Sequence, residues 1–302
     1  MMPPFSHALA LTALCWIGMA SGCASGPYQF GALRSLPPNA RERSEVAVCR
    51  GRPNAVVDSV GWVWGIPGKI LLWDRRVQNH HVSEETEIEV CQYLESNGLQ
   101  DVRVRVNQYD PAGEWQRLVA NKSVGAGWRY TFGTMHWLGY TLLPDRVFGD
   151  DTYNPYSNTL SIYSDVPALA VREAAYAKDV HNRKLPGTYA VVQDFSPLTL
   201  WHQTLATQDA LGYYQVAGDL QQRQEAYDIL SPQLGMNLGG VVDNRVGVVA
   251  GAVVGHVVGR VKSAALTDQP SQISHRVPAD HSEKRFVTQL TERPQVDLKD
   301  GE

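Results

Sequence analysis

Alternating hydrophobic and polar positions in the middle of the chain predict one strand followed by two helices. Residues 158–164, NTLSIYS, change sides at every position, and this period of two is typical of a strand. Residues 166–182 contain no helix breaker after Pro167, which fits a first helical turn, and Asp165 is placed to cap this helix. Residues 201–214 predict a second helix. We expect these three elements to organise the domain.

Two elements upstream have equally plain patterns. Residues 84–96 predict a helix that stops at Gly98, because glycine is a common C-terminal cap. Residues 101–107, DVRVRVN, alternate valine with arginine and predict a half-buried strand with Arg103 and Arg105 facing water. A helix beside a strand with one wet face favours an α+β fold over a doubly wound sheet.

Aromatic residues crowd the stretch that follows this strand. Trp128, Tyr130 and Phe132 alternate, which places them on one side of an extended segment, and Trp137 and Tyr140 follow. One interpretation is a sheet face packed on the core. The other is an aromatic groove beside the two central helices, in which a peptide or a lipid would lie.

An apolar segment nearer the N-terminus, residues 59–77, reads SVGWVWGIPGKILLWDRRV. Pro67 and its neighbours interrupt it, so it is not expected to span a membrane. Its expected role is core packing. The alternatives are contact with a membrane surface through Trp62, Trp64 and Trp73, or a wall of a substrate site.

The last third of the chain contains a regular series of glycines. Residues 218–230 predict a helix that Pro232 ends. In residues 235–259 glycine recurs mainly at intervals of four, and this segment resembles the glycine zippers of bacterial outer-membrane lipoproteins. Its uninterrupted apolar part, 246–255, covers about 15 Å as a helix, half of a bilayer core of about 30 Å, so a simple span is disfavoured.

Residues 243–245, Asp-Asn-Arg, are expected to turn this segment into a hairpin of two half-helices. The hairpin would dip into a membrane or self-associate, pack against the globular domain, or form β structure because of its many valines. The polar residues 264–302 predict a disordered tail.

Composition places the chain among globular proteins. It has 302 residues, 43% of them hydrophobic, which is enough for one sizeable domain with appendages. The formal net charge of −4 shows no basic excess, so nucleic acid is not expected as a partner.

The N-terminus is typical of an exported protein. Residues 1–26 are apolar and end in small residues. Ala20-Ser21-Gly22-Cys23 resembles a bacterial lipobox, which implies cleavage before Cys23 and a lipid anchor on that residue; the alternative is an ordinary signal peptide. By resemblance to bacterial sorting rules, Ala24 favours the outer membrane over the inner. Residues 24–45 are rich in Gly, Pro and charge and are expected to be a tether.

Two cysteines remain in the mature chain besides the acylated one, because Cys15 lies in the signal segment. Cys49 and Cys91 are a candidate disulfide in an oxidising compartment. The alternative is that Cys91 is a buried thiol, since it shares the apolar face of its helix with Ile88 and Leu94.

The first central helix contains Arg172-Glu173-Ala-Ala-Tyr176, and this stretch resembles the HExxH helix of gluzincin-type zinc metallopeptidases. The second helix, with Gln203, resembles the one that gives such enzymes their third ligand, a glutamate. The resemblance implies an α+β, zincin-like fold, a small mixed sheet packed on an active-site-type helix and a backing helix. It also implies that Arg172, Tyr176 and Gln203 occupy the metal-ligand positions and Glu173 that of the catalytic base.

These residues do not suit zinc. Arginine offers no lone pair, glutamine is a weak neutral donor, and a phenol must ionise to bind strongly. Arg172, Tyr176 and Asp179 lie within about 60° of one another on a helix, so they share a face. We therefore expect Arg172 to replace the charge of the metal and to pair with Glu173 or with Asp179 behind the site. No cofactor is expected.

Two other interpretations remain for these helices. They are ordinary helices unrelated to a metal site, or they hold zinc through substitute ligands such as His181 and His202. His181 lies about 180° from Arg172 around its helix, and His202 is turned about 100° from Gln203, which disfavours both.

The predicted organisation has five parts. They are a signal peptide (1–22), a tether (23–45), a degenerate zincin-like domain (46–232), a glycine-zipper segment (233–263) and a disordered tail (264–302).

The sequence favours a lipid-anchored protein of the bacterial cell envelope with a non-catalytic, metallopeptidase-like binding or scaffold domain. One alternative is a zinc metallopeptidase acting on envelope peptides with Glu173 as general base. Another makes the glycine zipper the active part, as a membrane-associating or oligomerising module. Expected partners are the membrane, through Cys23 and the zipper, a peptide or protein ligand, and a second copy of the chain.

Overall fold

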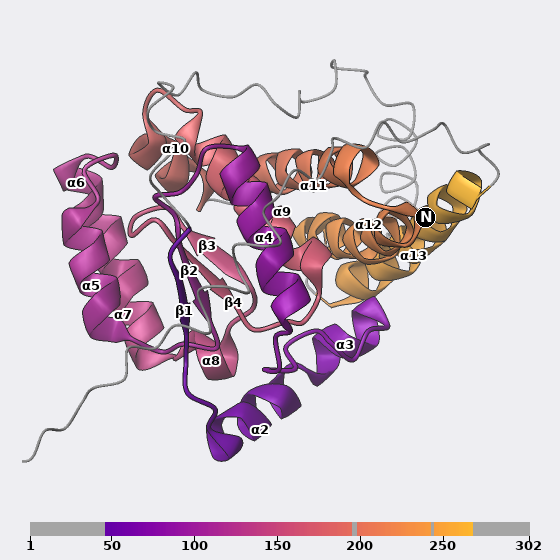
Figure 1. The fold of residues 1–302 in the computed structure, drawn as a ribbon, viewed down its shortest axis with the longest axis horizontal. Coiled ribbons are helices and arrows are strands. Elements are labelled where there is room, and N and C mark those ends of the chain that lie inside the picture. The colour runs from indigo at the N-terminus through magenta and orange to yellow at the C-terminus, as the bar shows by residue number, and fades with distance from the viewer. Residues whose placement is uncertain (1–45, 195–197, 243–244, 268–302) are drawn as a thin grey trace, which may run out of the picture. The chain divides into compact units, whose positions relative to one another are not determined.

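A computed structural model describes residues 46–267 except 195–197 and 243–244. The predictions for the signal peptide, Cys23, the tether, most of the tail and part of the hairpin turn lie outside these residues. The described chain is mixed α+β, a small four-stranded sheet packed with helices (Figure 1). This part of the predicted fold class is confirmed.

The sheet has the strand order β1-β2-β4-β3. The central pair, β2 (Arg103–Val106) and β4 (Thr159–Ile162), are parallel neighbours, and β1 (Val48–Arg50) extends them on one side. At the other edge β3 (Thr152–Asn154) runs antiparallel to β4. The strands predicted over 101–107 and 158–164 are thus confirmed, and all four residues of β4 are buried.

Helices line both faces of the sheet (Figure 1). Valines of β2 join the main core with α4 (Glu84–Ser96) and α9 (Pro167–His181). On the other side Arg105 is only 3% exposed, and its guanidinium lies 3.2 Å from the carboxylate of Glu114 in α5 (Pro111–Ala120). The prediction that Arg105 faces water was wrong, because α5 covers that face and supplies the opposite charge.

The helix α9 is buried along almost its whole length. Its N-cap is Val166 and makes no side-chain hydrogen bond, so the prediction that Asp165 caps it was wrong. Asp165 instead accepts hydrogen bonds from the amide of Ser83 (2.8 Å) and the hydroxyl of Thr86 (2.8 Å) at the start of α4. The same carboxylate therefore ties the beginnings of α4 and α9 together.

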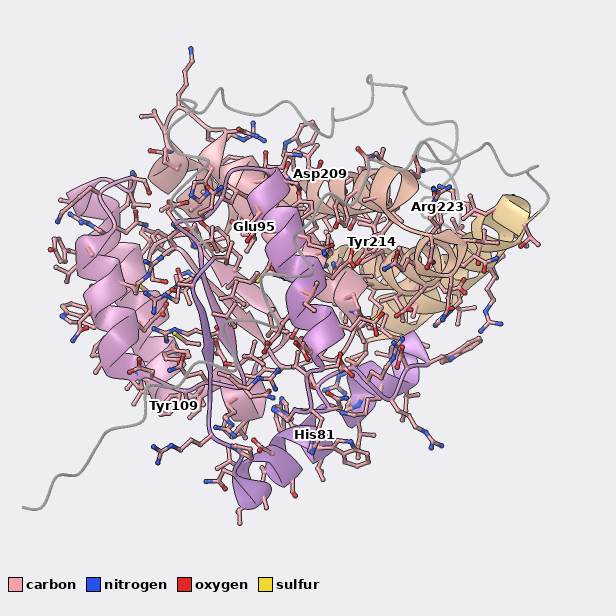
Figure 2. The ribbon with its side chains drawn as sticks, viewed as in Figure 1. His81, Glu95, Tyr109, Asp209, Tyr214 and Arg223 are labelled. Carbon is pink, nitrogen blue, oxygen red and sulfur yellow. The ribbon has the colours of Figure 1, made fainter. Side chains whose placement is uncertain are left out.

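The second central helix, α11 (Thr199–Ala217), packs along α9. A buried ion pair joins them, with Lys178 Nζ 2.9 Å from Asp209 Oδ1, and the hydroxyl of Tyr93 in α4 donates to the same carboxylate. Asp209 is labelled in Figure 2. Small residues, among them Ala174 and Ala206, are buried in this core. The two predicted helices and their neighbourhood are confirmed.

The aromatic stretch is helical, so the predicted sheet face was wrong. It consists of α6 (Ala126–Trp128), a π-helical segment η2 (Arg129–Gly133) and α7 (Thr134–Leu142). Trp128 and Phe132 are four residues apart and meet edge to face at 5.8 Å. A helix brings such residues together, whereas the alternation of three aromatic side chains had indicated a strand.

The glycine series lies in a pair of long helices, α12 (Leu220–Val242) and α13 (Val246–Thr267). The helix α12 continues through Pro232, contrary to the prediction. A Cβ added to Gly235 would lie 2.1 Å from the carbonyl oxygen of Gly251, and one on Gly255 would lie 2.3 Å from Cα of Pro232. The two backbones therefore touch, and the glycines serve packing within the chain.

The apolar segment near the N-terminus forms α2 (Ala55–Trp64) and α3 (Ile66–Leu72), bent by 49°. The prediction that this segment packs in the core is confirmed for Leu72, which is buried. It was wrong for Trp62, Trp64 and Trp73, which are exposed. In the described chain, α13, and α2 with α3 taken together, are long and apolar enough to cross a membrane by length and composition. The short helices α8 (Asp145–Phe148) and α10 (Pro186–Gln193) complete the fold.

Candidate functional site

Polar side chains from three helices meet where α9, α11 and α12 pack together. Arg172 of α9 forms an ion pair with its neighbour Glu173, and its Nη1 donates to Oε1 of Gln203 in α11 over 3.1 Å. Both Arg172 and Glu173 are buried. Two of the three positions that the metallopeptidase resemblance assigns to metal ligands, Arg172 and Gln203, are therefore in direct contact.

Glu173, the position of the catalytic base, has both carboxylate oxygens engaged. Oε1 faces the Arg172 guanidinium, and Oε2 accepts a hydrogen bond from the backbone amide of Tyr153 in the edge strand β3 over 3.1 Å. A general base must present a free lone pair to the proton that it removes. Here the carboxylate joins a helix to the edge of the sheet.

Tyr176, one turn further along α9, borders this cluster through aromatic contacts. Its ring stacks on that of His202 with 4.3 Å between centroids and meets Tyr153 edge to face at 5.6 Å. Burial raises the pKa of its hydroxyl, with nearby carboxylates adding to the effect, so the phenol stays protonated. A protonated phenol is a poor metal ligand.

His202, the neighbour of Gln203 in α11, borders the cluster on the side of Tyr176. It is buried against Tyr176, and its Nδ1 is 3.2 Å from Oε1 of Gln193. Burial, together with the charge of Arg172, lowers its pKa to about 4, so the imidazole is neutral at pH 7. His202 and Gln203, about 100° apart around α11, both contact α9, His202 through Tyr176 and Gln203 through Arg172.

Asp179 takes no part in the Arg172 cluster. It pairs with Arg183, which lies just beyond the end of α9, and accepts a hydrogen bond from the hydroxyl of Tyr189 in α10. Of the two partners predicted for Arg172, the structure has Glu173. His181 is also separate, with its Nε2 3.3 Å from Asp101, as its position on the helix had indicated.

The helix α12 supplies two residues that the sequence analysis had missed. The amide nitrogen of Asn237 donates to Oε1 of Gln203. With its amide oxygen turned toward Arg172, Gln233 accepts from both terminal guanidinium nitrogens over 3.2 and 3.3 Å. Both residues lie beyond the predicted domain boundary at 232, which α12 crosses without a break. In the sequence these two residues stand out only as polar residues, four positions apart, at the start of the glycine series.

The residues of this site do not fit the zinc ion that the resemblance would supply. The ligand positions hold an arginine that cannot lose its proton, a protonated phenol and a carboxamide that is already hydrogen-bonded. In the described parts of the chain, no group of three His, Cys, Asp or Glu residues is arranged to hold a metal ion.

Cys49 and Cys91 are free thiols in the structure. Cys49 lies in β1, where its sulfur is 3.2 Å from a guanidinium nitrogen of Arg103. Cys91 packs against the main core from α4, and burial raises its pKa to about 11. The structure has no bridge between Cys49 and Cys91, and the alternative of a buried Cys91 thiol is met in part, because this residue is half-buried.

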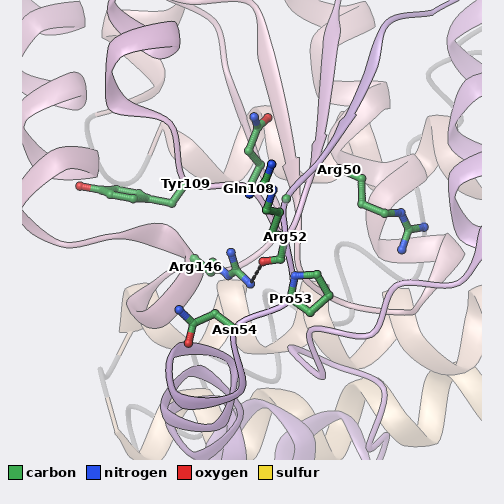
Figure 3. A pocket seen from close by; sticks show the side chains of 8 residues that line it. Arg50, Arg52, Pro53, Asn54, Gln108, Tyr109 and Arg146 are labelled. Carbon is green, nitrogen blue, oxygen red and sulfur yellow. Dashed lines mark hydrogen bonds between the residues drawn. The ribbon is translucent and has the colours of Figure 1, made fainter. Parts of the chain in front are cut away.

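A separate hollow of about 470 Å³ lies between the end of β1, the start of α2 and α8 (Figure 3). Three arginines line it, but two are already paired. Arg146 lies 2.7 Å from Asp58 and donates to the carbonyl of Arg52, and Arg50 contacts Glu87. Arg52 is left as the exposed cation at its rim.

Comparison with known proteins found no matching family model, no matching curated protein and no matching solved structure. The residues of the site therefore carry the functional argument alone.

Proposed function

We propose that this chain is a lipid-anchored protein of the bacterial cell envelope. Its domain resembles a zincin-type metallopeptidase but is non-catalytic, and it acts as a binding or scaffold module. The order strand, helix, helix and the small mixed sheet with an antiparallel edge strand support the zincin-like comparison. The lipid anchor rests on the lipobox-like sequence at Cys23.

One observation carries the non-catalytic assignment, the ion pair between Arg172 and Glu173. In a metallopeptidase the metal and its bound water would face the base. Here a permanently charged guanidinium lies beside the base, and the edge-strand amide of Tyr153 holds its second oxygen. A dication about 4 Å from Arg172 would be repelled by several kcal/mol at an effective dielectric of about 20. The guanidinium of Arg172 thus takes the place of the positive charge that a zinc ion would supply in a metallopeptidase.

The contacts from α12 support the same role. Gln233 and Asn237 place carboxamides on Arg172 and Gln203, where an active enzyme would need an open coordination position for water. The terminal guanidinium nitrogens of Arg172, the carboxylate of Glu173 and the amide oxygen of Gln203 therefore find partners within the chain, whereas Nε of Arg172 is buried without one among the described residues. We infer that the site stabilises the packing of α9, α11 and α12 and leaves the outer surface of the domain for binding.

Metal analysis tests this proposal. The chain beginning at Ala24 keeps every described residue and lacks the acylated cysteine. After purification without chelators and incubation with excess zinc, we expect far less than one equivalent of zinc by mass spectrometry and no peptidase activity. One equivalent of zinc, with peptidase activity that Glu173→Gln removes, would establish the enzyme instead.

A further inference from the structure

The outer sides of α2, α3 and α13 present large hydrophobic residues to solvent. We call this surface the apolar face and define it by six side chains that are 51–74% exposed, Val56, Val60, Ile70, Val253, Val257 and Val261. Single exposed hydrophobic residues are common, but rows of them at helical spacing mark an interaction surface.

Small and large residues lie on different sides of α13. Gly251, Gly255 and Gly259 are buried and lie against α12. Val253, Val257 and other valines at spacings of three and four point outward. A helix whose outer side met only water would carry polar residues there, whereas these outward positions are valine as far as Arg260.

Direct contacts hold α3 and α13 together. His256 Nε2 lies 2.8 Å from the carbonyl oxygen of Leu71, and its ring stacks on Trp73 with 4.1 Å between centroids. The guanidinium of Arg260 lies 4.9 Å from the centre of the same indole. Because α2 leads directly into α3 through Gly65, the exposed rows of the three helices belong to one connected part of the fold.

The charges around the apolar face are mainly positive, although Asp74, which pairs with Arg76, follows Trp73, and Asp228 lies near Arg260. The helix α13 contains no acidic residue and carries Arg260 and Lys262 in its second half. Arg52 before α2 and Arg75 after α3 are exposed. The acidic residue of α2, Asp58, is neutralised by Arg146 at 2.7 Å.

We propose that the apolar face rests on the surface of a lipid bilayer that contains anionic phospholipids. Valine and isoleucine side chains would enter the boundary between headgroups and acyl chains, tryptophans would lie at headgroup depth, and the flanking cations would meet phosphate groups. A second copy of the chain fits less well. A two-fold symmetric contact sets the face against itself, so one mainly cationic surface would meet a second one.

This inference extends the proposed function by making lipid a direct partner of the folded domain. The expected tether, residues 24–45, would keep the domain within about 25 Å of an anchored Cys23 on average. The apolar face does not depend on that anchor, so it is tested without it.

The test is cosedimentation of the chain beginning at Ala24 with vesicles of phosphatidylethanolamine and phosphatidylglycerol. We expect most of the protein to bind, and we expect binding at least tenfold weaker to vesicles of phosphatidylcholine alone. Raising the salt from about 0.05 to about 0.5 M shortens the Debye length and should weaken binding several-fold without abolishing it. Protein that stays in the supernatant with anionic vesicles would overturn the proposal.

Matched substitutions locate the surface. Val60→Glu with Val257→Glu should lower vesicle binding at least tenfold, because both place a carboxylate on the apolar face. Val192→Glu with Val216→Glu, on exposed positions of α10 and α11, should change it less than about twofold. Equal losses in both pairs, or no loss in the first, would contradict the proposal.

Each substitution is also tested singly, with circular dichroism as a check of folding, so one misfolded variant does not decide the result. Light scattering tests the second-copy alternative. A dimer that Val257→Glu dissociates, with no vesicle binding by the wild type, would assign the face to self-association. Zinc content is measured on the same samples. It tests only whether the domain binds metal, so a failure of the proposed function can be told apart from a failure of the lipid-binding proposal.

Discussion

Arg172 Nη1 lies 3.1 Å from Oε1 of Gln203, so the first and third positions of the metallopeptidase-like ligand set meet across α9 and α11. Tyr176, the second position, turns to His202 instead. The two helices thus face each other at these positions, and the ion pair of Arg172 with Glu173 lies beside the contact.

Removing the positive charge alone should be strongly destabilising. In Arg172→Met the buried carboxylate of Glu173 loses its partner, and loss of one member of a buried ion pair costs about 3–5 kcal/mol. The double variant Arg172→Met with Glu173→Gln removes both charges and should recover most of that loss. Urea unfolding followed by circular dichroism measures both. Equal destabilisation in the single and double variants would contradict the pairing.

Restoring the ligand residues should restore metal binding. The triple variant Arg172→His, Tyr176→His and Gln203→Glu places two imidazoles and a carboxylate on the facing sides of α9 and α11. We expect about one equivalent of zinc by metal analysis, with the single variant Gln203→Glu as a control that binds none. If the triple variant folds and binds no zinc, the two helices are not arranged like those of a zincin.

His202 should make stability depend on pH in the acidic range. Its pKa falls from 6.5 to about 4 in the folded chain, so below pH 6.5 the unfolded chain takes up a proton that the native chain does not. Stability is therefore lost as pH falls from 6.5 toward 4, at a slope of at most about 1.4 kcal/mol per pH unit from this group.

The variant His202→Phe keeps the stacking on Tyr176 and removes the titration. Between pH 7 and 5, the free energy of unfolding should fall less in this variant than in the wild type. Urea unfolding at both pH values measures the difference. The same fall in both proteins would show that His202 is not buried as a neutral imidazole.

The glycines of the α12–α13 pair should not tolerate side chains. In Gly251→Val the new Cβ would meet the carbonyl of Gly235 at 1.9 Å, and such overpacking costs about 1–3 kcal/mol or more. Gly212→Ala in α11 is the matched control, because its Cβ would meet nothing within 4 Å and alanine favours a helix by up to about 1 kcal/mol. Thermal unfolding compares them, and an unchanged melting temperature for Gly251→Val would exclude the close backbone contact.

The regular patterns predicted their elements well. The helix at 84–96, the strands containing Val104 and Leu160 and both central helices were found because apolar spacing is a local property of the chain. Arg105 was misplaced because burial depends on what covers a strand, and Glu114 in the covering helix could not be assigned to it from the sequence.

The site was predicted in part for a similar reason. Arg172, Glu173 and Gln203 came from the resemblance of two helices, and their contact is present in the structure. Gln233 and Asn237 were missed because they reach the site only through the path of α12. Pro232 had suggested that this helix ends before them, whereas the packing of α13 accommodates the proline within it.

The hydrogen bond from the amide of Tyr153 to Glu173 has a consequence for recognition. In active peptidases of the zincin type, a substrate often lengthens the sheet by lying along its border strand. Here the amide of Tyr153 in the edge strand β3 already donates to the carboxylate of Glu173, and Arg172 neutralises that carboxylate. An incoming polypeptide would have to take this amide away from Oε2 of Glu173 and leave that buried oxygen without its partner. A partner of this domain should therefore recognise side chains on its exterior and leave the sheet at four strands.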